Sequence, residues 1–415
     1  MLMSTRSLLV GRRVMALLGI AFLCGSPVFG QENALTLDQV LEVARKRAPI
    51  VIAARARIEE ARGRYQGAAV RLRNNPVVEM EAGPRTRSGD RTADLDVVFG
   101  QDFELGGRRK ARIAGAEAGI DRETAFSNDV LRRLLRDVAI AFYRALAGQE
   151  RIRILAMTDD VANEFLRTAE RRYEAGEIPI LEVNLARTSA ARVRAELKTA
   201  SADSVLALGD LRTLLGMRPD EPLAIRGDLR ARRSYDLEQL FAQAKDRPDI
   251  RVLEAEIREA EADIRLGEGF RRPDIGFTAR YQREERANVF QGGLKITIPV
   301  FSHGQELRVV GTARASRLRG ELEALFRVSY TEVKAALDAY LEKLSAVEEL
   351  EKNALPSVGE NEMLARRSYE EGEIGLAELL LIRRETLETR LAYVDRLLDA
   401  AIAGVEVEFR SGVLR

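Results

Sequence analysis

The chain lacks tryptophan and has only one cysteine and one histidine among its 415 residues. The lone histidine, His303, excludes a metal site built from several histidines. Its place at an expected strand-to-helix junction favours a structural role over a catalytic one. The sequence also has no phosphate-binding loop. We therefore expect no enzyme activity, no cofactor and no metal site.

Aromatic residues make up 6% of the chain, whereas charged residues reach 32%. This balance is typical of proteins with much solvated helix surface and little compact core. Basic and acidic residues are nearly equal, at 66 and 65, so the charge gives no reason to expect a nucleic acid as partner. With 11 prolines in all, long spans remain free for uninterrupted helices.

The N-terminus has the features of a secretory signal peptide, predicted to cover residues 1–30. Three arginines precede an apolar segment, Val14 to Cys24, that is too short to span a membrane. Cleavage after Gly30 would remove three arginines and no acidic residue, which lowers the net charge from +1 to −2. Lipid attachment at Cys24 is the alternative, although Leu23 is larger than the residue that normally precedes a lipidated cysteine.

Two stretches that lie 196 positions apart are close copies of each other. Residues 173–187 read YEAGEIPILEVNLAR and residues 369–383 read YEEGEIGLAELLLIR, with eight of fifteen positions identical. Gly176 and Gly372 each lie between two long helical patterns, where a left-handed residue would end one helix before the next begins. We interpret both stretches as the tips of long helical hairpins in a duplicated chain.

The duplication predicts two repeats, 31–215 and 237–415, joined by a linker at 216–236. LDQVLEVARKRAPI at 37–50 is matched by LEQLFAQAKDRPDI at 237–250. In each repeat two helices precede two strands and two long helices. The expected fold class is therefore mainly α with a small β part.

Strands are predicted where the apolar period changes from 3.6 to 2, at 77–83, 94–105, 274–282 and 290–300, with a loop at 84–91. Apolar residues share one face of each strand and polar residues the other. The strands are close to the roughly 9–11 residues that a tilted strand needs to cross an outer membrane. The polar faces would suit a wet lumen, for which the candidates are Asp94, Asp96, Asp102, Glu104, Arg280 and Lys295.

Beyond residue 30 no apolar run reaches eighteen residues, so we expect no transmembrane helix. An exported chain of this kind is soluble in the periplasm, secreted, or held in an outer membrane by strands. Four strands do not close a barrel, and an open sheet in lipid would leave edge groups unpaired at roughly several kcal/mol each. Strands in a membrane therefore require oligomerisation, and three copies would supply twelve. A soluble α+β protein, with a structural or adaptor role and coiled-coil helices, is the alternative.

This arrangement resembles the TolC-like outer membrane efflux proteins over about residues 36–412. The resemblance is carried by the two Y-x-x-G tips, by FELGGRRKAR at 103–112 and by ITIPVFSHGQ at 296–305, which look like strand-to-helix junctions. FELGGRRKAR looks most like the CzcC-like branch, which serves heavy-metal cation efflux. The ordered set across two repeats is more specific than any one motif.

The resemblance implies a homotrimer whose twelve-stranded β-barrel crosses the cell outer membrane and continues as a long periplasmic α-helical barrel. It also implies docking on a periplasmic adaptor protein and an inner-membrane pump of the resistance–nodulation–division (RND) type, with residues 216–236 in an equatorial region. The expected function is the exit duct of a tripartite efflux system for heavy-metal cations. Export of drugs or other small molecules is the alternative.

The hairpin tips are predicted to contact the adaptor. Their residues look exposed beside a turn and recur in both repeats, and binding residues often lie on such loops. The alternative is that these residues only end helices. The candidates are Tyr173, Gly176, Ile178, Tyr369, Gly372 and Ile374.

Glu182 and Glu378 lie six residues after the tip glycines. In TolC-like channels an acidic ring narrows the periplasmic entrance, and Glu378 matches one of its positions, whereas Leu381 replaces the family's second acid. Six such carboxylates in a trimer would repel one another and attract cations, with Arg187, Arg383 or nearby arginines on neighbouring helices expected as compensating charges. We predict a gate here, the alternative being ordinary solvated helix positions.

A basic cluster follows the second strand. We expect it to meet lipid headgroups just below the barrel rather than nucleic acid, because cationic side chains are favoured at an anionic membrane surface. The cluster consists of Arg108, Arg109, Lys110 and Arg112.

Overall fold

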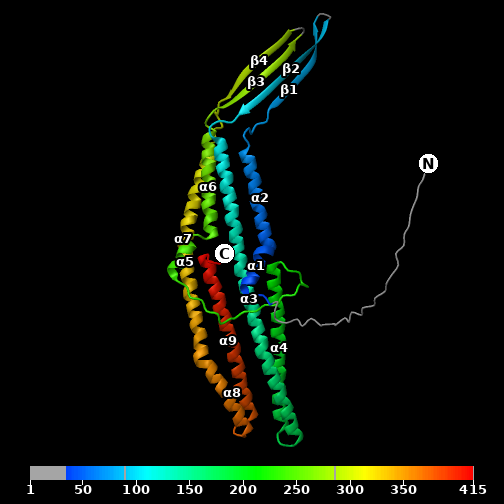
Figure 1. The fold of residues 1–415 in the computed structure, drawn as a ribbon, viewed down its shortest axis with the longest axis vertical. Coiled ribbons are helices and arrows are strands. Elements are labelled where there is room, and N and C mark those ends of the chain that lie inside the picture. Colours follow the sequence, from blue (N-terminus) through cyan, green and yellow to red (C-terminus); the bar gives the residue numbers. More distant parts are fainter. Residues whose placement is uncertain (1–33, 88–89, 285–286, 415) are drawn as a thin grey trace, which may run out of the picture. The chain divides into compact units, whose positions relative to one another are not determined.

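The element order predicted from the sequence is confirmed, because two helices, two strands and two long helical arms occur twice (Figure 1). The computed structural model describes residues 34–87, 90–284 and 287–414, so the expected signal peptide at 1–30 lies outside the described residues, as does Cys24. The elements all belong to one unit, Leu35–Arg415.

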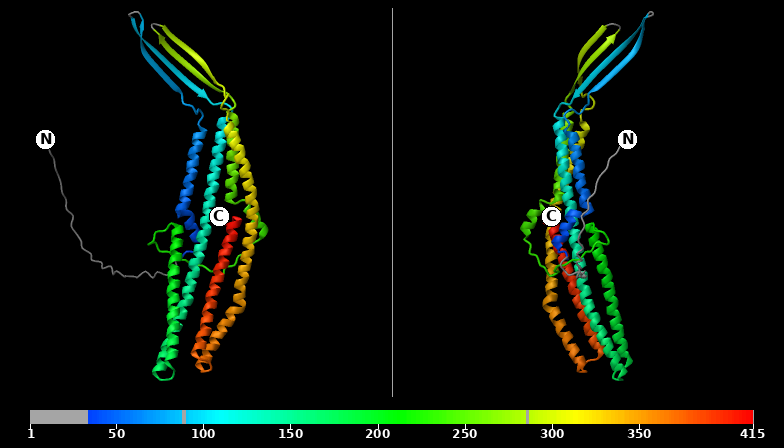
Figure 2. Two further views of the ribbon diagram at one scale, coloured as in Figure 1. Left: turned by 180° about the vertical axis from the view of Figure 1, so that it is seen from behind. Right: turned by 45° about the vertical axis from the view of Figure 1, so that its right-hand side comes forward.

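In the first half the elements are α1 (Leu37–Arg47), α2 (Pro49–Ala69), β1 (Val77–Arg87), β2 (Asp90–Phe103), α3 (Arg108–Glu174) and α4 (Ile180–Leu215). In the second half they are α5 (Leu237–Ala244), α6 (Pro248–Gly269), β3 (Asp274–Glu284), β4 (Ala287–Thr297), α7 (Gln305–Glu349), the π-helix η2 (Leu350–Ala354), α8 (Leu355–Glu370) and α9 (Leu376–Ser411). The sheet lies at one end of α2, α3, α6 and α7. The α3–α4 and α8–α9 turns lie together at the opposite end (Figure 1 and Figure 2).

Local side-chain signals start the short helices in both halves. The Thr36 hydroxyl accepts a hydrogen bond from the Gln39 amide, and the Gln39 side chain accepts one from the Thr36 amide at 2.9 Å, which forms a capping box. In the second half the Asp236 carboxylate accepts from the Gln239 amide at 3.0 Å. The following helices, α2 and α6, each begin with a proline, a favourable first-turn residue.

The four strands form one antiparallel sheet in the order β1-β2-β3-β4. Pairing of β2 with β3, for example Phe99 opposite Ala279, joins the two halves of the chain. Within the described chain β1 and β4 are therefore the two edges, each with one side that has no partner strand.

The strand ends differ from the sequence prediction. The loop predicted at 84–91 is wrong over most of its length, because β1 continues to Arg87 and β2 begins at Asp90. Pro84 lies inside β1, opposite Ala93, and an edge strand tolerates proline because fewer of its N–H groups are needed for pairing. The other ends shift by two or three residues, to Phe103 in β2, Glu284 in β3 and Thr297 in β4.

The helices α3, α4 and α7 contain no proline, and Pro356 in α8 is the first proline inside a long helical arm. α3 alone has 67 residues. The helix from α7 to α8 is interrupted by the π-helix η2 directly before Pro356, a residue that lacks an N–H for the regular helical bond. Among the helices of the described residues, none is both long enough and apolar enough to cross a membrane.

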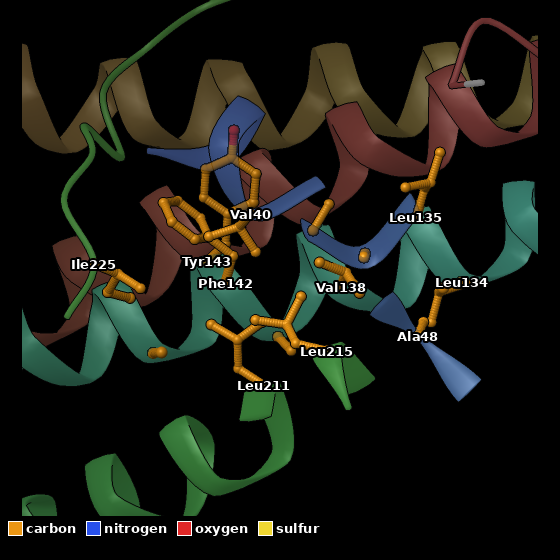
Figure 3. Close-up of a cluster of buried hydrophobic side chains, with 14 of the residues drawn as sticks. Val40, Ala48, Leu134, Leu135, Val138, Phe142, Tyr143, Leu211, Leu215 and Ile225 are labelled. Atoms are coloured by element: carbon orange, nitrogen blue, oxygen red, sulfur yellow. The ribbon is translucent and has the colours of Figure 1, made fainter. Parts of the chain in front are cut away.

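The largest apolar cluster joins α1, α3, α4 and the linker (Figure 3). Leu135 and Phe142, two of the regularly spaced apolar residues of α3, are fully buried against Leu211 of α4. Ile225 of the linker joins this cluster, and its backbone bridge to Leu35 fixes the linker to the start of the first repeat. Burial of these side chains stabilises the helix pair and the linker together.

Two buried arginines cap the C-terminal end of α9. The guanidinium of Arg132 donates to the carbonyl oxygen of Phe409 at 2.8 Å, and that of Arg247 donates to the carbonyl oxygen of Arg410 at 3.2 Å. Arg247 also donates to the Asp249 carboxylate at 2.6 Å. The last carbonyls of a helix carry partial negative charge, so cations stabilise them.

We expect acid to weaken this site through Asp249. Burial alone would raise the pKa of Asp249, but the hydrogen bonds and charge of Arg247 outweigh it, and the pKa is lowered. The ionised carboxylate therefore stabilises the fold above the unfolded-state pKa of about 4, and this stabilisation is lost as the pH falls through the folded-state pKa. Thermal unfolding followed by circular dichroism should show a lower midpoint for Asp249→Asn at pH 7. The difference from wild type should shrink below about pH 4, and a difference independent of pH would contradict this role.

Candidate functional site

The sheet has one charged face and one apolar face. The register places Asp96 opposite Gln282 and Asp102 opposite Gly276, so the polar residues of β2 and β3 share a face. Apolar residues alternate with them on the other face, where several are largely exposed, with exposed fractions of 79% for Phe290 and 77% for Leu294. The alternation predicted from the sequence is therefore present in the sheet.

Ion pairs cross the strands on the charged face. Lys295 on β4 reaches over Gly276 on β3 to the Asp102 carboxylate on β2, at 3.0 Å. Gly276 leaves room for this contact, because a Cβ there would lie 2.2 Å from an Asp102 oxygen. Arg280 donates to both carboxylate oxygens of Asp96 at 2.9 Å.

The charged face has more acids than bases. The alternation places seven described carboxylates and three described cations on it, and one of these carboxylates, Asp274, pairs with Arg108 beyond the sheet, which leaves a surplus of three negative charges among these residues. Such a surface attracts cations and repels anions. The carboxylates are Glu79, Glu81, Asp94, Asp96, Asp102, Asp274 and Glu284, and the cations are Arg85, Arg280 and Lys295.

Glu104 does not belong to this face, which corrects the sequence prediction. It follows the last residue of β2, and its largely buried carboxylate lies 3.6 Å from Arg108 and also pairs with Arg112. Arg108 in turn pairs with Asp274. The expectation that the basic cluster meets lipid headgroups is therefore wrong for Arg108 and Arg112, because internal carboxylates already neutralise both.

Both strand-to-helix junctions pack closely against the C-terminal end of α6. Gly106 precedes α3 and Gly304 precedes α7, with φ angles of 78° and 76°. A Cβ on Gly106 would lie 2.4 Å from the Gly269 carbonyl oxygen, and one on Gly304 would lie 2.3 Å from the Gly267 carbonyl oxygen. The sequence motifs predict the junctions but do not predict this contact. In the sequence it is indicated only by the two glycines of α6.

At the opposite end, the tips end their helices in the same way. The Gly176 amide donates to the Tyr173 carbonyl and the Glu177 amide donates to the Arg172 carbonyl, both at 2.9 Å, which is a Schellman motif. Gly176 has a φ of 76° and Gly372, at the second tip, one of 79°. Both glycines thus have the left-handed conformation expected from the sequence.

The tip candidates differ in exposure. Ile178 is only 8% exposed and packs in an apolar cluster between the hairpins, so the expectation of an exposed side chain is wrong there. Tyr369 and Ile374 are half-buried against the same cluster. The apolar side chain of Ile178 gains more from this cluster than from water. The exposed candidates are Tyr173, Gly176 and Gly372.

The gate candidates differ in their electrostatic surroundings, because the positive charge of Arg172 on α3 acts on Glu182. Glu182 is half-buried and Glu378 exposed, and neither carboxylate has a hydrogen bond or ion pair among the described residues. Among the described residues neither Arg187 nor Arg383 supplies the expected compensation, since Arg187 contacts Glu170 and Arg383 lies over the ring of Phe165. The arginine whose charge acts on Glu182 is Arg172, on the neighbouring helix.

Metal ligands do not cluster in the part of the chain that the structure describes, where no group of three or more His, Cys, Asp or Glu could hold an ion. The Nδ1 atom of His303 accepts a hydrogen bond from the Arg308 guanidinium at 3.0 Å, at the start of α7. What the geometry offers is thus a charged sheet face, two hairpin tips and two unpaired carboxylates.

Comparison with known protein families decides the class. The model of the outer membrane efflux protein family matches residues 40–217 and 242–412, which is most of the chain. The chain belongs to the outer membrane efflux protein family. This family consists of outer-membrane channels rather than enzymes, so both the predicted family and the predicted class are confirmed. Its location in the cell outer membrane, with a periplasmic helical part, is confirmed as well.

Individual relatives agree with the family. The chain is 25% identical over 375 residues to the cobalt-zinc-cadmium resistance protein CzcC of Cupriavidus metallidurans, covering 89% of this chain and 88% of CzcC. It is 25% identical over 384 residues to the pyoverdine export outer membrane protein OpmQ of Pseudomonas putida, covering 86% and 79%. The fold matches the crystal structure of the Campylobacter jejuni CmeC outer membrane channel with a TM-score of 0.76 and 15% identity, covering 91% and 85%. The predicted mainly α fold with a small β part is confirmed.

Proposed function

We propose that this efflux protein is the trimeric exit duct of a tripartite system that exports heavy-metal cations. The observation that carries the proposal is the sheet, which has two open edges, one acidic face and one exposed apolar face. A sheet of this kind in lipid would leave the edge groups of β1 and β4 unpaired at roughly several kcal/mol each.

Other copies of the chain would pair these edges. Along the sheet the strand direction alternates, so β4 of one copy would run antiparallel to β1 of the next. Three copies would close a ring of twelve strands with the acidic face toward the lumen and the apolar face toward outer membrane lipid. The number three comes from the resemblance to TolC-like proteins.

The acidic surplus supports cations as cargo. A lumen lined by carboxylates raises the local concentration of cations and disfavours anions. The name of the relative CzcC refers to resistance against cobalt, zinc and cadmium. Since no metal cluster occurs in the described residues, an RND-type pump in the inner membrane would supply the choice of metal.

An organic cargo is the alternative. OpmQ, a relative of similar identity, is named for pyoverdine export. In both cases the exposed tip residues Tyr173, Gly176 and Gly372 would meet a periplasmic adaptor protein.

Gene deletion and complementation would test the cargo. Loss of the gene should lower resistance to cobalt, zinc or cadmium, and the wild-type gene should restore it. Lower resistance to organic compounds alone would favour the alternative. A freely soluble monomer in the periplasm, instead of a detergent-requiring trimer, would contradict the duct itself.

A further inference from the structure

Arg187 and Arg383 occupy equivalent positions in the two hairpins, yet their contacts differ. In the first hairpin Arg187 on α4 donates to Glu170 on α3 at 3.1 Å, so the ion pair ties together the two helices of one hairpin. In the second repeat, Arg366 occupies the position equivalent to Glu170, 196 residues further along the chain. The second hairpin therefore lacks the acid that would form the same ion pair.

Arg366 changes the surroundings of Arg383 in a defined way. It pairs with Glu370 on its own helix at 2.9 Å, and its positive charge opposes an approach by Arg383. Among the described residues Arg383 has no ion pair, and its Nε has no hydrogen-bond acceptor. An arginine in this position must find a different contact or remain in water.

Arg383 instead contacts the first hairpin. Its guanidinium lies over the ring of Phe165 on α3, at 3.9 Å from the ring centre. Tyr369 of the second hairpin approaches the same ring, with 6.2 Å between ring centres. Phe165 is thus contacted by two residues of the second hairpin, one from α9 and one from α8.

The other polar contacts between the hairpins are longer at this level, while the apolar cluster that includes Ile178 and Leu379 also joins the two hairpins. Arg172 donates to the Tyr369 hydroxyl at the long distance of 3.4 Å, and Arg192 lies 3.8 Å from Glu388. A cleft of about 360 Å³ with Phe165, Leu185 and Arg383 in its lining separates α4 from α9. The stacked pair therefore bridges the hairpins beside an open gap.

We propose that Arg383 is a positioning residue that holds the second hairpin against the first through the Phe165 ring. The proposal rests on the proposed duct, in which separation of the hairpins would widen the periplasmic entrance. A partly buried cation–π contact changes an equilibrium by about tenfold. Loss of this contact should raise the ratio of separated to closed hairpins by that factor.

The position of Arg366 provides the sharpest test. Arg366→Glu would give Arg383 the acidic partner that Arg187 has, so Arg383 should leave Phe165 for its own hairpin. The hairpins should then separate although both members of the stacked pair remain. Arg366→Gln removes the same positive charge without adding an acid, and Arg187→Gln breaks the equivalent pair in the first hairpin. Neither control should shift the ratio.

Spin labels on exposed tip residues would measure the ratio. Cysteines at Leu181 on α4 and Met363 on α8, which are 64% and 70% exposed, would be the only ones beyond residue 30. Pulsed electron paramagnetic resonance on trimers diluted with unlabelled chains would report their separation. The population at the longer distance should rise about tenfold in Arg366→Glu and in Phe165→Leu.

Two outcomes would overturn the proposal. One is an unchanged distance distribution in Arg366→Glu together with Phe165→Leu, and the other is an equal shift in Arg366→Gln. If Arg366→Glu does not assemble, Phe165→Leu decides alone. The distances require no transport, so a protein that shows the shift but conducts no ions would contradict the proposed duct and leave the role of Arg383 intact.

Discussion

Gly106→Ala is expected to prevent assembly of the protein, whereas Gly107→Ala, one residue away, is expected to be tolerated. Both glycines have positive φ, 78° and 75°, so an alanine costs roughly 1–2 kcal/mol at either position. Only at Gly106 would the new Cβ overlap a backbone atom, the Gly269 carbonyl oxygen at 2.4 Å, while at Gly107 no atom lies within 4 Å. The overlap cannot be relieved by a side-chain rotation and should add about 2 kcal/mol or more.

The expected size of the effect follows from the position of Gly106. The junction connects the sheet to α3, and the same end of α6 also receives Gly304 from the second junction. A shift of α6 away from Gly106 would therefore disturb both junctions at once. Gly304→Ala, where the new Cβ would lie 2.3 Å from the Gly267 carbonyl oxygen, should reproduce the defect.

Gel electrophoresis without boiling would measure the fraction of heat-sensitive trimer, and thermal unfolding would measure stability. Gly106→Ala should leave little trimer and Gly107→Ala close to the wild-type amount. Equal amounts in the two variants would show that backbone conformation alone governs this turn.

Changing both Glu182 and Glu378 to Gln should weaken block by multivalent cations about tenfold and lower cation selectivity. Among the described residues neither carboxylate forms an ion pair or a hydrogen bond, so in a trimer six charges would act on ions at the periplasmic entrance. The amide has nearly the same shape as the carboxylate, which leaves charge as the main difference.

Single-channel recording in a planar bilayer would make this measurement. The matched control combines Glu177→Gln with Glu373→Gln. These two acids also occupy equivalent positions at the two tips, and their substitution removes the same number of charges. In the structure they are already engaged, with Arg172 at 3.1 Å and Ser368 at 2.9 Å. Identical conductance, selectivity and block in the wild type and in the Glu182 and Glu378 variant would remove these residues from the gate.

Much of the fold was accessible from sequence because its signals are local. The two tips follow from glycines between helical patterns, and Gly176 and Gly372 indeed have left-handed backbones. The faces of the strands follow from alternation, since neighbouring residues of a strand point in opposite directions. Pro84 shows the limit of the local signal, because the sequence predicts a loop there whereas pairing with β2 keeps it in an edge strand.

The contacts of single side chains were less accessible. Ile178 looked exposed beside its turn, yet the other hairpin buries it. Glu104 continued the acidic pattern of its strand, yet the start of α3 brings two arginines to it. In each case the partner comes from another element, and the periodicity of the residue's own segment does not predict the contact.

The duplicated order of helices and strands and the two faces of the sheet could be predicted from the sequence, and its motifs carried the resemblance to the family. The order and the faces depend on periodicity and on glycine positions, which act over a few residues. Only the tertiary structure decided that Gly106 and Gly304 meet one helix end and that Arg383 crosses to Phe165. Those contacts join residues from different elements, and packing in three dimensions selects one partner among many of similar chemistry.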